Sequence, residues 1–230
     1  PKTRCIDGVA MVLIGLINNI FFLIIFSSAQ RIVEHFHATG YLAMVNWSCT
    51  FCGLFANGIN SLLTTFNVSY DWRFIANTIC MGIGLLGSAF ATSFWLACAS
   101  ILFIGFSCNF GESVALGYLV YLKKQHYVKF WGIGTGTAGV LGSTYSALCI
   151  AFEISYKLSF ECLIPLIIVY FLSYFFVIRE KNVNEDTPLL ENGKPAPMPS
   201  VSEGNNENID ASTNTNTLKM WCNCSFLRKI

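Results

Sequence analysis

The residues of this chain that could do chemistry are one carboxylate and several amides, all set inside long uncharged runs of sequence. Glu112 is the only acidic residue that lies more than a turn or two inside such a run. The candidate amides are Asn18, Asn19, Asn57, Asn60 and Asn109. Polar side chains in apolar surroundings cost free energy unless they face other polar groups or a cavity. We therefore predict that these side chains line a pathway for a small polar solute.

Helical spacing places these polar residues on continuous faces. One face carries Gly53, Asn57, Asn60 and Thr64, and a second carries Gly105, Asn109, Glu112 and Leu116. A plainer alternative is that the amides hydrogen-bond between helices as structural contacts, each worth about 0.6–2 kcal/mol. In that alternative Glu112 also bonds a neighbouring helix and has no part in transport.

The stretch GTGTAG at residues 134–139 spells G-x-G-x-x-G, the pattern of dinucleotide-binding folds. That pattern binds pyrophosphate only between a strand and a helix, with an acidic residue about 20 positions on in a βαβ unit. Here the basic stretch KKQHYVK precedes it, and it lies inside an uncharged run over residues 130–152. We therefore predict a helix-packing or hinge surface, formed by Gly132, Gly134, Gly136, Gly139 and Gly142. Of these, Gly132, Gly136 and Gly139 share one face with Ser143, which we expect to be the close-packing face.

No set of residues indicates catalysis. The uncharged runs contain no serine with a nearby histidine and no paired aspartates, and the chain contains neither H-E-x-x-H nor a Gly-Lys-Ser phosphate loop. Cys49 and Cys52 form a C-x-x-C pair without a second pair or a histidine nearby. We expect no enzyme activity, no cofactor and no metal. A net charge of +1 without a dense basic surface also argues against nucleic acid as a partner.

The elements that position these residues are membrane helices. The chain of 230 residues is 54% hydrophobic and only 12% charged, about half the charge of a soluble domain. Uncharged runs long enough to cross about 30 Å of hydrocarbon predict an all-α bundle of six transmembrane helices over residues 1–178. The spans are 8–29, one within 41–66, two separated by a break at 91–94 within 74–122, 130–152, and 159–178. We predict a disordered cytosolic loop at 179–217 and the start of another membrane-proximal segment at 218–230.

Basic residues set the orientation, because cytosolic connections carry an excess of Lys and Arg. One side has Lys2, Arg4, Arg73, Lys123, Lys124, Lys129, Arg179 and Lys181, and the other has Arg31 and Lys157. The first side is predicted to be cytosolic, with both ends of the chain on it. Charged groups at the mouths are then Arg31, His35 and His37 on the luminal side and Lys123, Lys124 and His126 on the cytosolic side. Among the sequons only Asn46 lies near the lumen, as a possible glycosylation site.

The polar, Asn-rich tail contains two leucines that packing does not explain. Glu185, Leu189 and Leu190 form an acidic dileucine pattern, which clathrin adaptors bind in sorting to endosomes and lysosomes. We predict that the tail carries this sorting signal. The apolar and basic residues at 218–230 favour a longer protein, of which this chain is the first six-helix half plus a loop.

Two stretches resemble a known family. GLINNIFFLIIFSSAQRI at residues 15–32 and GESVALGYLVYLKKQHYVKFWGIGTGTAGVLGSTY at residues 111–145 are similar to the battenin family, the lysosomal membrane proteins of juvenile neuronal ceroid lipofuscinosis. The resemblance runs from about Gly15 to Arg179. It implies a major-facilitator-like fold of two six-helix bundles, residence in late endosomal and lysosomal membranes, and export of glycerophosphodiesters from the lysosome.

The sequence departs from that family at two places, and other functions stay open. The first luminal loop, residues 30–40, is short and lacks a cluster of sequons, and the chain holds no second bundle. A nucleoside or basic amino-acid carrier is an alternative, because amides suit neutral polar solutes and no span contains a cation. A non-transporting membrane scaffold in endolysosomal trafficking is another.

Overall fold

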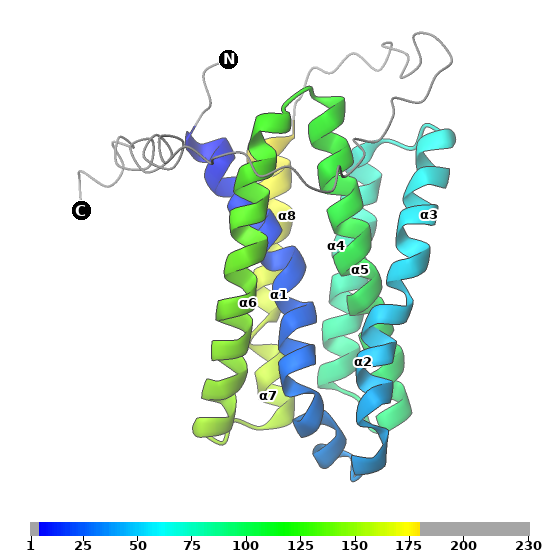
Figure 1. Cartoon of the computed structure of the whole chain (residues 1–230), viewed down its shortest axis with the longest axis vertical. Helices are drawn as coiled ribbons and strands as arrows, with labels where there is room; N and C mark the ends of the chain where they lie inside the picture. Colours follow the sequence, from blue (N-terminus) through cyan, green and yellow to red (C-terminus); the bar gives the residue numbers. More distant parts are fainter. Residues whose placement is uncertain (1–4, 180–230) are drawn as a thin grey trace, which may run out of the picture. The chain divides into compact units, whose positions relative to one another are not determined.

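The computed structural model describes residues 5–179, which belong to one compact unit, Pro1–Arg179. These residues form helices and short connections and contain no strand, which confirms the predicted all-α class for them. The elements are α1 (Cys5–His35), η1 (Thr39–Tyr41), α2 (Leu42–Phe51), α3 (Gly53–Thr65), α4 (Tyr70–Ala89), α5 (Phe94–Tyr121), η2 (Gln125–Tyr127), α6 (Val128–Ala151), α7 (Tyr156–Glu161), α8 (Ile164–Leu172) and the π-helical η3 (Ser173–Ile178). The longer helices run side by side, while α2 and α3, and likewise α7 and α8, follow one another end to end (Figure 1).

Four segments of the described chain are long and apolar enough to cross a membrane, namely Ile6–His35, Thr39–Thr65, Phe94–Tyr121 and Tyr156–Ile178. The other two predicted spans correspond to α4 and α6, which are 20 and 24 residues long. Their mean hydropathy is lower because α4 contains Arg73 and Asn77, and α6 is rich in Gly, Ser and Thr. The predicted break at residues 91–94 is confirmed, since α4 ends at Ala89 and α5 begins at Phe94.

Four helices end in the same way. The residues that follow the last turns adopt left-handed backbone angles, with φ between 49° and 54°, at His37, Asn67, Lys123 and Glu153. Each end has the paired hydrogen bonds of a Schellman motif, such as Lys124 N to Leu119 O at 2.9 Å and Lys123 N to Val120 O at 2.9 Å. These motifs satisfy the last carbonyls of each helix and turn the chain back into the bundle.

The second and sixth predicted spans are each interrupted, which differs from the continuous helices expected from the sequence. The second breaks at Cys52, between α2 and α3. There the carbonyl oxygen of Cys49 lies against Gly105 so closely that no side chain would fit between the two helices. The sixth breaks between α7 and α8, where Pro165 stands in the first turn of α8. Proline is tolerated there because a first-turn N–H has no partner within the helix.

Helix α1 lies at the centre of the bundle and packs on α6, α2, α5 and η3. The α1–α6 contact uses glycines from both helices. A Cβ atom added at Gly15 would lie 2.6 Å from the backbone oxygen of Trp131, and one at Gly134 would collide with the backbone oxygen of Val12. Gly142 lies against Leu23 in the same interface. The two backbones therefore approach at a distance that only glycine permits.

The face of α6 that packs on α1 differs from the face that the glycine spacing favoured. Within the described residues, a Cβ atom at Gly132, Gly136 or Gly139 would meet nothing within 4 Å. The face that packs on α1 instead contains Gly134, Ala138 and Gly142, which are all buried. Both faces carry small residues at helical spacing, and spacing alone does not distinguish a face that packs within the bundle from one that stays open.

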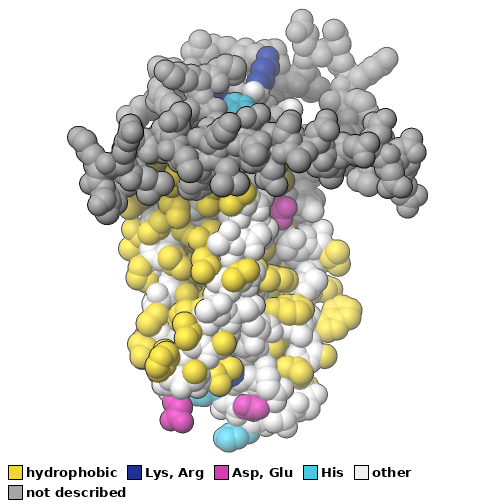
Figure 2. Space-filling view, turned by 60° about the vertical axis from the view of Figure 1, so that its left-hand side comes forward, with side chains coloured by type: hydrophobic (Ala, Val, Ile, Leu, Met, Phe, Trp, Pro, Cys, Tyr) yellow, Lys and Arg dark blue, Asp and Glu magenta, His cyan; other side chains and the backbone are white. Residues whose placement is uncertain are grey.

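Charged side chains lie mainly at the ends of the bundle. In Figure 2 hydrophobic side chains cover much of the surface, interrupted by an area of small and polar side chains and backbone, and most visible charges gather at the lower edge. The connections alternate between two ends (Figure 1). Asp7, Asp71 and Arg179 lie at one end, and His35 lies at the other with the start of α7. The start of α1 and the end of η3 share the first of these ends, as the prediction of an even number of spans requires.

Candidate functional site

A buried hydrogen-bond network crosses the middle of the bundle. Asn18 Nδ2 donates to the carbonyl oxygen of Cys108 at 2.7 Å, and Asn18 Oδ1 accepts from Asn77 Nδ2 at 3.3 Å. Asn77 Nδ2 also donates to the hydroxyl of Tyr170 at 3.0 Å. Gly111 makes room for the two amides, because a Cβ atom there would overlap both. Asn18, which we predicted to line a pathway, is thus enclosed by α4, α5 and α8.

Asn19 is buried at the edge of the core, where α1 contacts α5 and α6. Its Nδ2 donates to Gly15 O at 3.0 Å and to Thr135 Oγ1 of α6 at 3.1 Å, and its Oδ1 accepts from Cys108 Sγ at 3.4 Å. Thr135 is half-buried. The side chain therefore ties α1 to both α5 and α6, and its neighbour on α6 reaches the surface.

The predicted stripes on α3 and α5 face each other. Gly53 lies against the amide of Asn109, where a side chain would clash. One turn further, Ser113 Oγ donates a short hydrogen bond to Asn57 Oδ1. Asn57 is exposed and Asn109 is half-buried. The two stripes thus meet along the α3–α5 contact and leave polar groups open at its edge.

Asn60 is held by a cation that the sequence analysis assigned only to a connection. Arg73 is 3% exposed. Its Nη1 donates to Asn60 Oδ1 at 3.0 Å and to Thr64 Oγ1 at 2.8 Å, while Nε and Nη2 donate to Val68 O. The guanidinium also lies 4.6 Å from the ring centroid of Tyr70. Arg73 therefore caps the C-terminal end of α3, where a positive charge interacts favourably with the helix dipole.

Glu112 lies between Asn109 and Ser113 on α5 and is half-buried. Neither a hydrogen bond nor an ion pair joins its carboxylate to another residue of the described chain. Cys108, one turn earlier on the same face, contacts Asn19 of α1, whereas Ser113 contacts Asn57 of α3. The carboxylate is therefore partly exposed on the part of α5 that lies between its contacts with α1 and with α3.

The predicted mouth residues divide between the two ends. At one end His35 stacks on Tyr156 of α7, with ring centroids 4.4 Å apart, while His37 is an exposed turn residue and Arg31 is half-buried. At the other end Lys123 and His126 are exposed, and Lys124 is half-buried. None of these side chains lies in the middle of the bundle, so they do not join the polar groups of α3 and α5.

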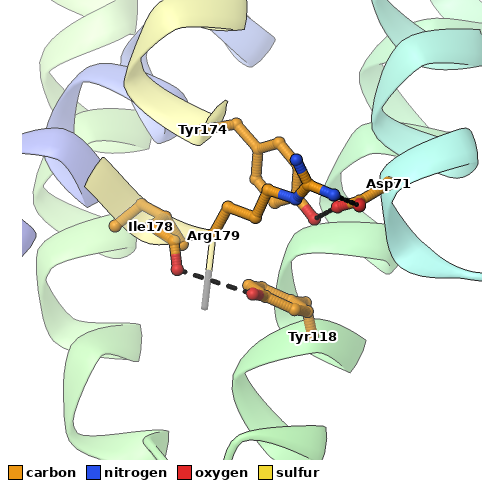
Figure 3. Close-up of polar contacts among 5 residues, drawn as sticks. All are labelled: Asp71, Tyr118, Tyr174, Ile178 and Arg179. Carbon is orange, nitrogen blue, oxygen red and sulfur yellow. Dashed lines mark hydrogen bonds and ion pairs between the residues drawn. The ribbon is translucent and has the colours of Figure 1, made fainter. Parts of the chain in front are cut away.

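A second cluster, which sequence reasoning missed, joins the start of α4 to the end of η3 (Figure 3). Arg179 Nη2 lies 2.5 Å from Asp71 Oδ2, and Tyr174 donates to Asp71 Oδ1 at 2.8 Å. The hydroxyl of Tyr118 lies 3.5 Å from Ile178 O. The π-helical turn lets Tyr174 and Arg179 reach the same carboxylate, and π-helical turns are often found at functional positions.

Of the predicted glycosylation and sorting sites, the structure describes only the glycosylation site. Asn46 lies in α2, half-buried, and its Oδ1 atom is buried without a hydrogen-bond partner. Glycosylation requires an accessible surface asparagine, so this geometry is unfavourable for it. Glu185, Leu189 and Leu190 lie outside the described residues.

The chemistry available to this arrangement is hydrogen bonding and charge complementarity. Among the described residues no group of three or more His, Cys, Asp or Glu side chains could hold a metal ion. Amides and hydroxyls on the open edge can donate to or accept from a solute, and Glu112 can accept or pair with a positive group. Such a surface can bind a polar solute selectively.

Comparison with known proteins identifies relatives. A family model described as "CLN3 protein" matches residues 9–223. The chain is 31% identical over 174 residues to Battenin of Dictyostelium discoideum, covering 75% of this chain and 41% of that protein. It is 27% identical over 183 residues to Protein BTN1 of Saccharomyces cerevisiae, covering 77% of this chain and 41% of that protein. No solved structure was found that matches it.

The chain thus spans less than half the length of the curated relatives that it matches. The family match covers nearly all described residues, including the α3, α5 and α6 faces. Several of its helices are long and apolar enough to cross a membrane. The chain therefore belongs to the CLN3 (battenin) family of multi-pass membrane proteins.

Proposed function

We propose that this chain forms the first six-helix bundle of a lysosomal transporter that exports glycerophosphodiesters by alternating access. The observation that carries the proposal is the open polar edge along α3 and α5. Asn57 is exposed there, and Asn60, Asn109 and Glu112 are half-buried within segments apolar enough for a membrane. Uncompensated polar groups facing lipid are costly. A solute pathway between this edge and a second bundle would keep them hydrated.

Contacts at both ends and in the middle of the bundle support a rocking mechanism. At one end Asp71 binds Arg179 and Tyr174, and at the other His35 stacks on Tyr156. In the middle, glycines hold α1 and α6 in backbone contact. A bundle tied at both ends and in the middle moves as a unit, and alternating access in two-bundle transporters is largely rigid-body motion around a fixed site. The open small-residue face at Gly132, Gly136 and Gly139 offers a surface on which a second bundle could slide.

The location of the protein is part of the same proposal. The basic connections at residues 123–129 and the end of η3 lie at one end of the bundle, which we assign to the cytosol. The dileucine pattern at Leu189 and Leu190 would then face clathrin adaptors and direct the protein to late endosomes and lysosomes.

Cells that lack the protein provide the test. Expression of the wild type should lower the glycerophosphodiester content of purified lysosomes, and Glu112→Gln should restore less of this clearance at equal lysosomal abundance. Glu161→Gln is a matched control, because Glu161 lies in α7 and pairs with exposed Lys157 at 3.5 Å. Equal clearance by Glu112→Gln and wild type would remove Glu112 from the pathway.

Two other outcomes would indicate a different function. If lysosomes from cells that lack the protein instead have a normal glycerophosphodiester content and accumulate nucleosides or basic amino acids, a carrier for those solutes is favoured. Normal contents of all three, with altered traffic of other lysosomal proteins, would favour a membrane scaffold.

A further inference from the structure

The orientation of the Asn60 amide is fixed by its partner. A guanidinium group can only donate hydrogen bonds, so the atom that contacts Arg73 Nη1 at 3.0 Å must be the oxygen of Asn60. The amide nitrogen then points away from Arg73, and no hydrogen bond joins it to any described residue. It is not among the buried side-chain atoms that lack a partner. Asn60 therefore presents an accessible N–H donor.

Asn57 lies one turn earlier on α3, and its side chain is exposed. Its oxygen accepts from Ser113 Oγ, and no hydrogen bond joins its amide nitrogen to a described residue. Residues 57 and 60 are three positions apart, so both lie on the same side of the helix. The open edge of α3 is thus lined by amide donors.

Helix α5 presents the opposite polarity. Asn109 Nδ2 donates to the backbone oxygen of Gly105 at 3.0 Å. Because a carbonyl oxygen can only accept, this bond fixes the nitrogen inward and leaves Asn109 Oδ1 without a partner in the described chain. Glu112, three residues later, adds a carboxylate. The open edge of α5 is thus lined by acceptors.

We propose that the site selects solutes with two chemically different ends: an oxyanion end bound by Asn57 and Asn60 on α3, and an ammonium or hydroxyl end bound by Glu112 and Asn109 on α5. Arg73 fixes Asn60 in the donating orientation and adds positive potential on the α3 side. The donor and acceptor edges adjoin along the α3–α5 contact, so one small molecule can reach both. This inference rests on the proposed transport function and assigns the direction in which the solute lies.

Asn60→Asp tests the oxyanion side without removing the contact to Arg73. An aspartate oxygen accepts from Arg73 as the amide oxygen does, so α3 stays closed, while the outward N–H donor becomes an anionic oxygen. Thr64→Val is the matched control, because Thr64 also accepts from Arg73 at 2.8 Å and its loss changes no donor of Asn60. Glu112→Gln tests the opposite side.

The measurement is the dissociation constant of the purified full-length protein for three probes: glycerol 3-phosphate, choline and glycerophosphocholine. Asn60→Asp should weaken binding of glycerol 3-phosphate and glycerophosphocholine at least about tenfold, which corresponds to about 1.4 kcal/mol, and leave choline unchanged. Glu112→Gln should weaken choline and glycerophosphocholine by a similar factor and weaken glycerol 3-phosphate less, because the glutamine oxygen still accepts from its hydroxyls. Thr64→Val should leave all three as in the wild type.

The possible failures are distinct. Wild-type protein that binds none of the three probes overturns both the proposed function and this inference. Wild-type protein that binds them, with Asn60→Asp and Glu112→Gln weakening all probes equally, overturns the orientation of the solute alone. The same holds if Asn60→Asp strengthens binding of glycerol 3-phosphate.

Discussion

Replacing single glycines of α6 by alanine compares the two small-residue faces of that helix. A Cβ atom at residue 134 would collide with Val12 O and lie 2.8 Å from Leu16 N, both backbone atoms of α1. A Cβ atom at residue 136 would meet nothing within 4 Å in the described chain. Gly134→Ala must therefore push α1 away from α6, whereas Gly136→Ala requires no movement.

The expected magnitude follows from this difference. Inserting a methyl group into a close-packed contact costs about 1–3 kcal/mol. Alanine in place of glycine within a helix gains up to about 1 kcal/mol. Both positions lie inside α6, so the helix-propensity gain is similar and cancels between the variants. Gly134→Ala should have a free energy of unfolding about 1–3 kcal/mol below that of Gly136→Ala.

The assay is denaturant unfolding of the purified protein in detergent, with both variants and the wild type measured together. Gly136→Ala should equal or exceed the wild type in stability. Equal stability of the two variants, or a lower stability for Gly136→Ala, would refute the assignment of the α1–α6 contact to the face that contains Gly134.

Three further predictions concern the buried amide network, the Asp71–Arg179 ion pair and the sorting signal. Asn77→Ala should lower the free energy of unfolding by about 1–3 kcal/mol, because two buried hydrogen bonds are lost; a loss below about 0.5 kcal/mol in the same unfolding assay would contradict the network. Asp71→Asn combined with Arg179→Gln in a double-mutant cycle should give a coupling of about 0.2–1 kcal/mol, since both side chains are partly exposed; strictly additive effects would show that the pair is not coupled. Replacing Leu189 and Leu190 by alanine should move the protein toward the cell surface, measured by surface biotinylation, and continued lysosomal residence would show that another signal dominates.

Helix positions could be predicted from the sequence because charge is excluded from hydrocarbon. The uncharged runs located α5 and α6 closely, and the short polar break near Thr92 separated α4 from α5. Helix α1 ends at His35, beyond the predicted end at residue 29. The break at Cys52 could not be predicted in this way. It depends on the close approach of Cys49 to Gly105, a contact between residues far apart in the chain.

The polar site was only partly predictable. Periodicity put Asn57 and Asn60 on one face, but it gave no sign of Arg73, which approaches Asn60 from the next helix. Asn77 was missed although it is a lone amide inside an uncharged run, a signal equal to that of Asn18. Periodicity also did not distinguish the packed face of α6 from the open one, because both consist of small residues.

Solute flux through reconstituted vesicles tests the central claim of transport most directly. Phospholipid vesicles that contain the purified full-length protein should release trapped radiolabelled glycerophosphocholine faster than vesicles without protein. Glu112→Gln should slow that release, whereas Glu161→Gln should not. If vesicles with correctly folded protein release the solute no faster than protein-free vesicles, the transport function is contradicted.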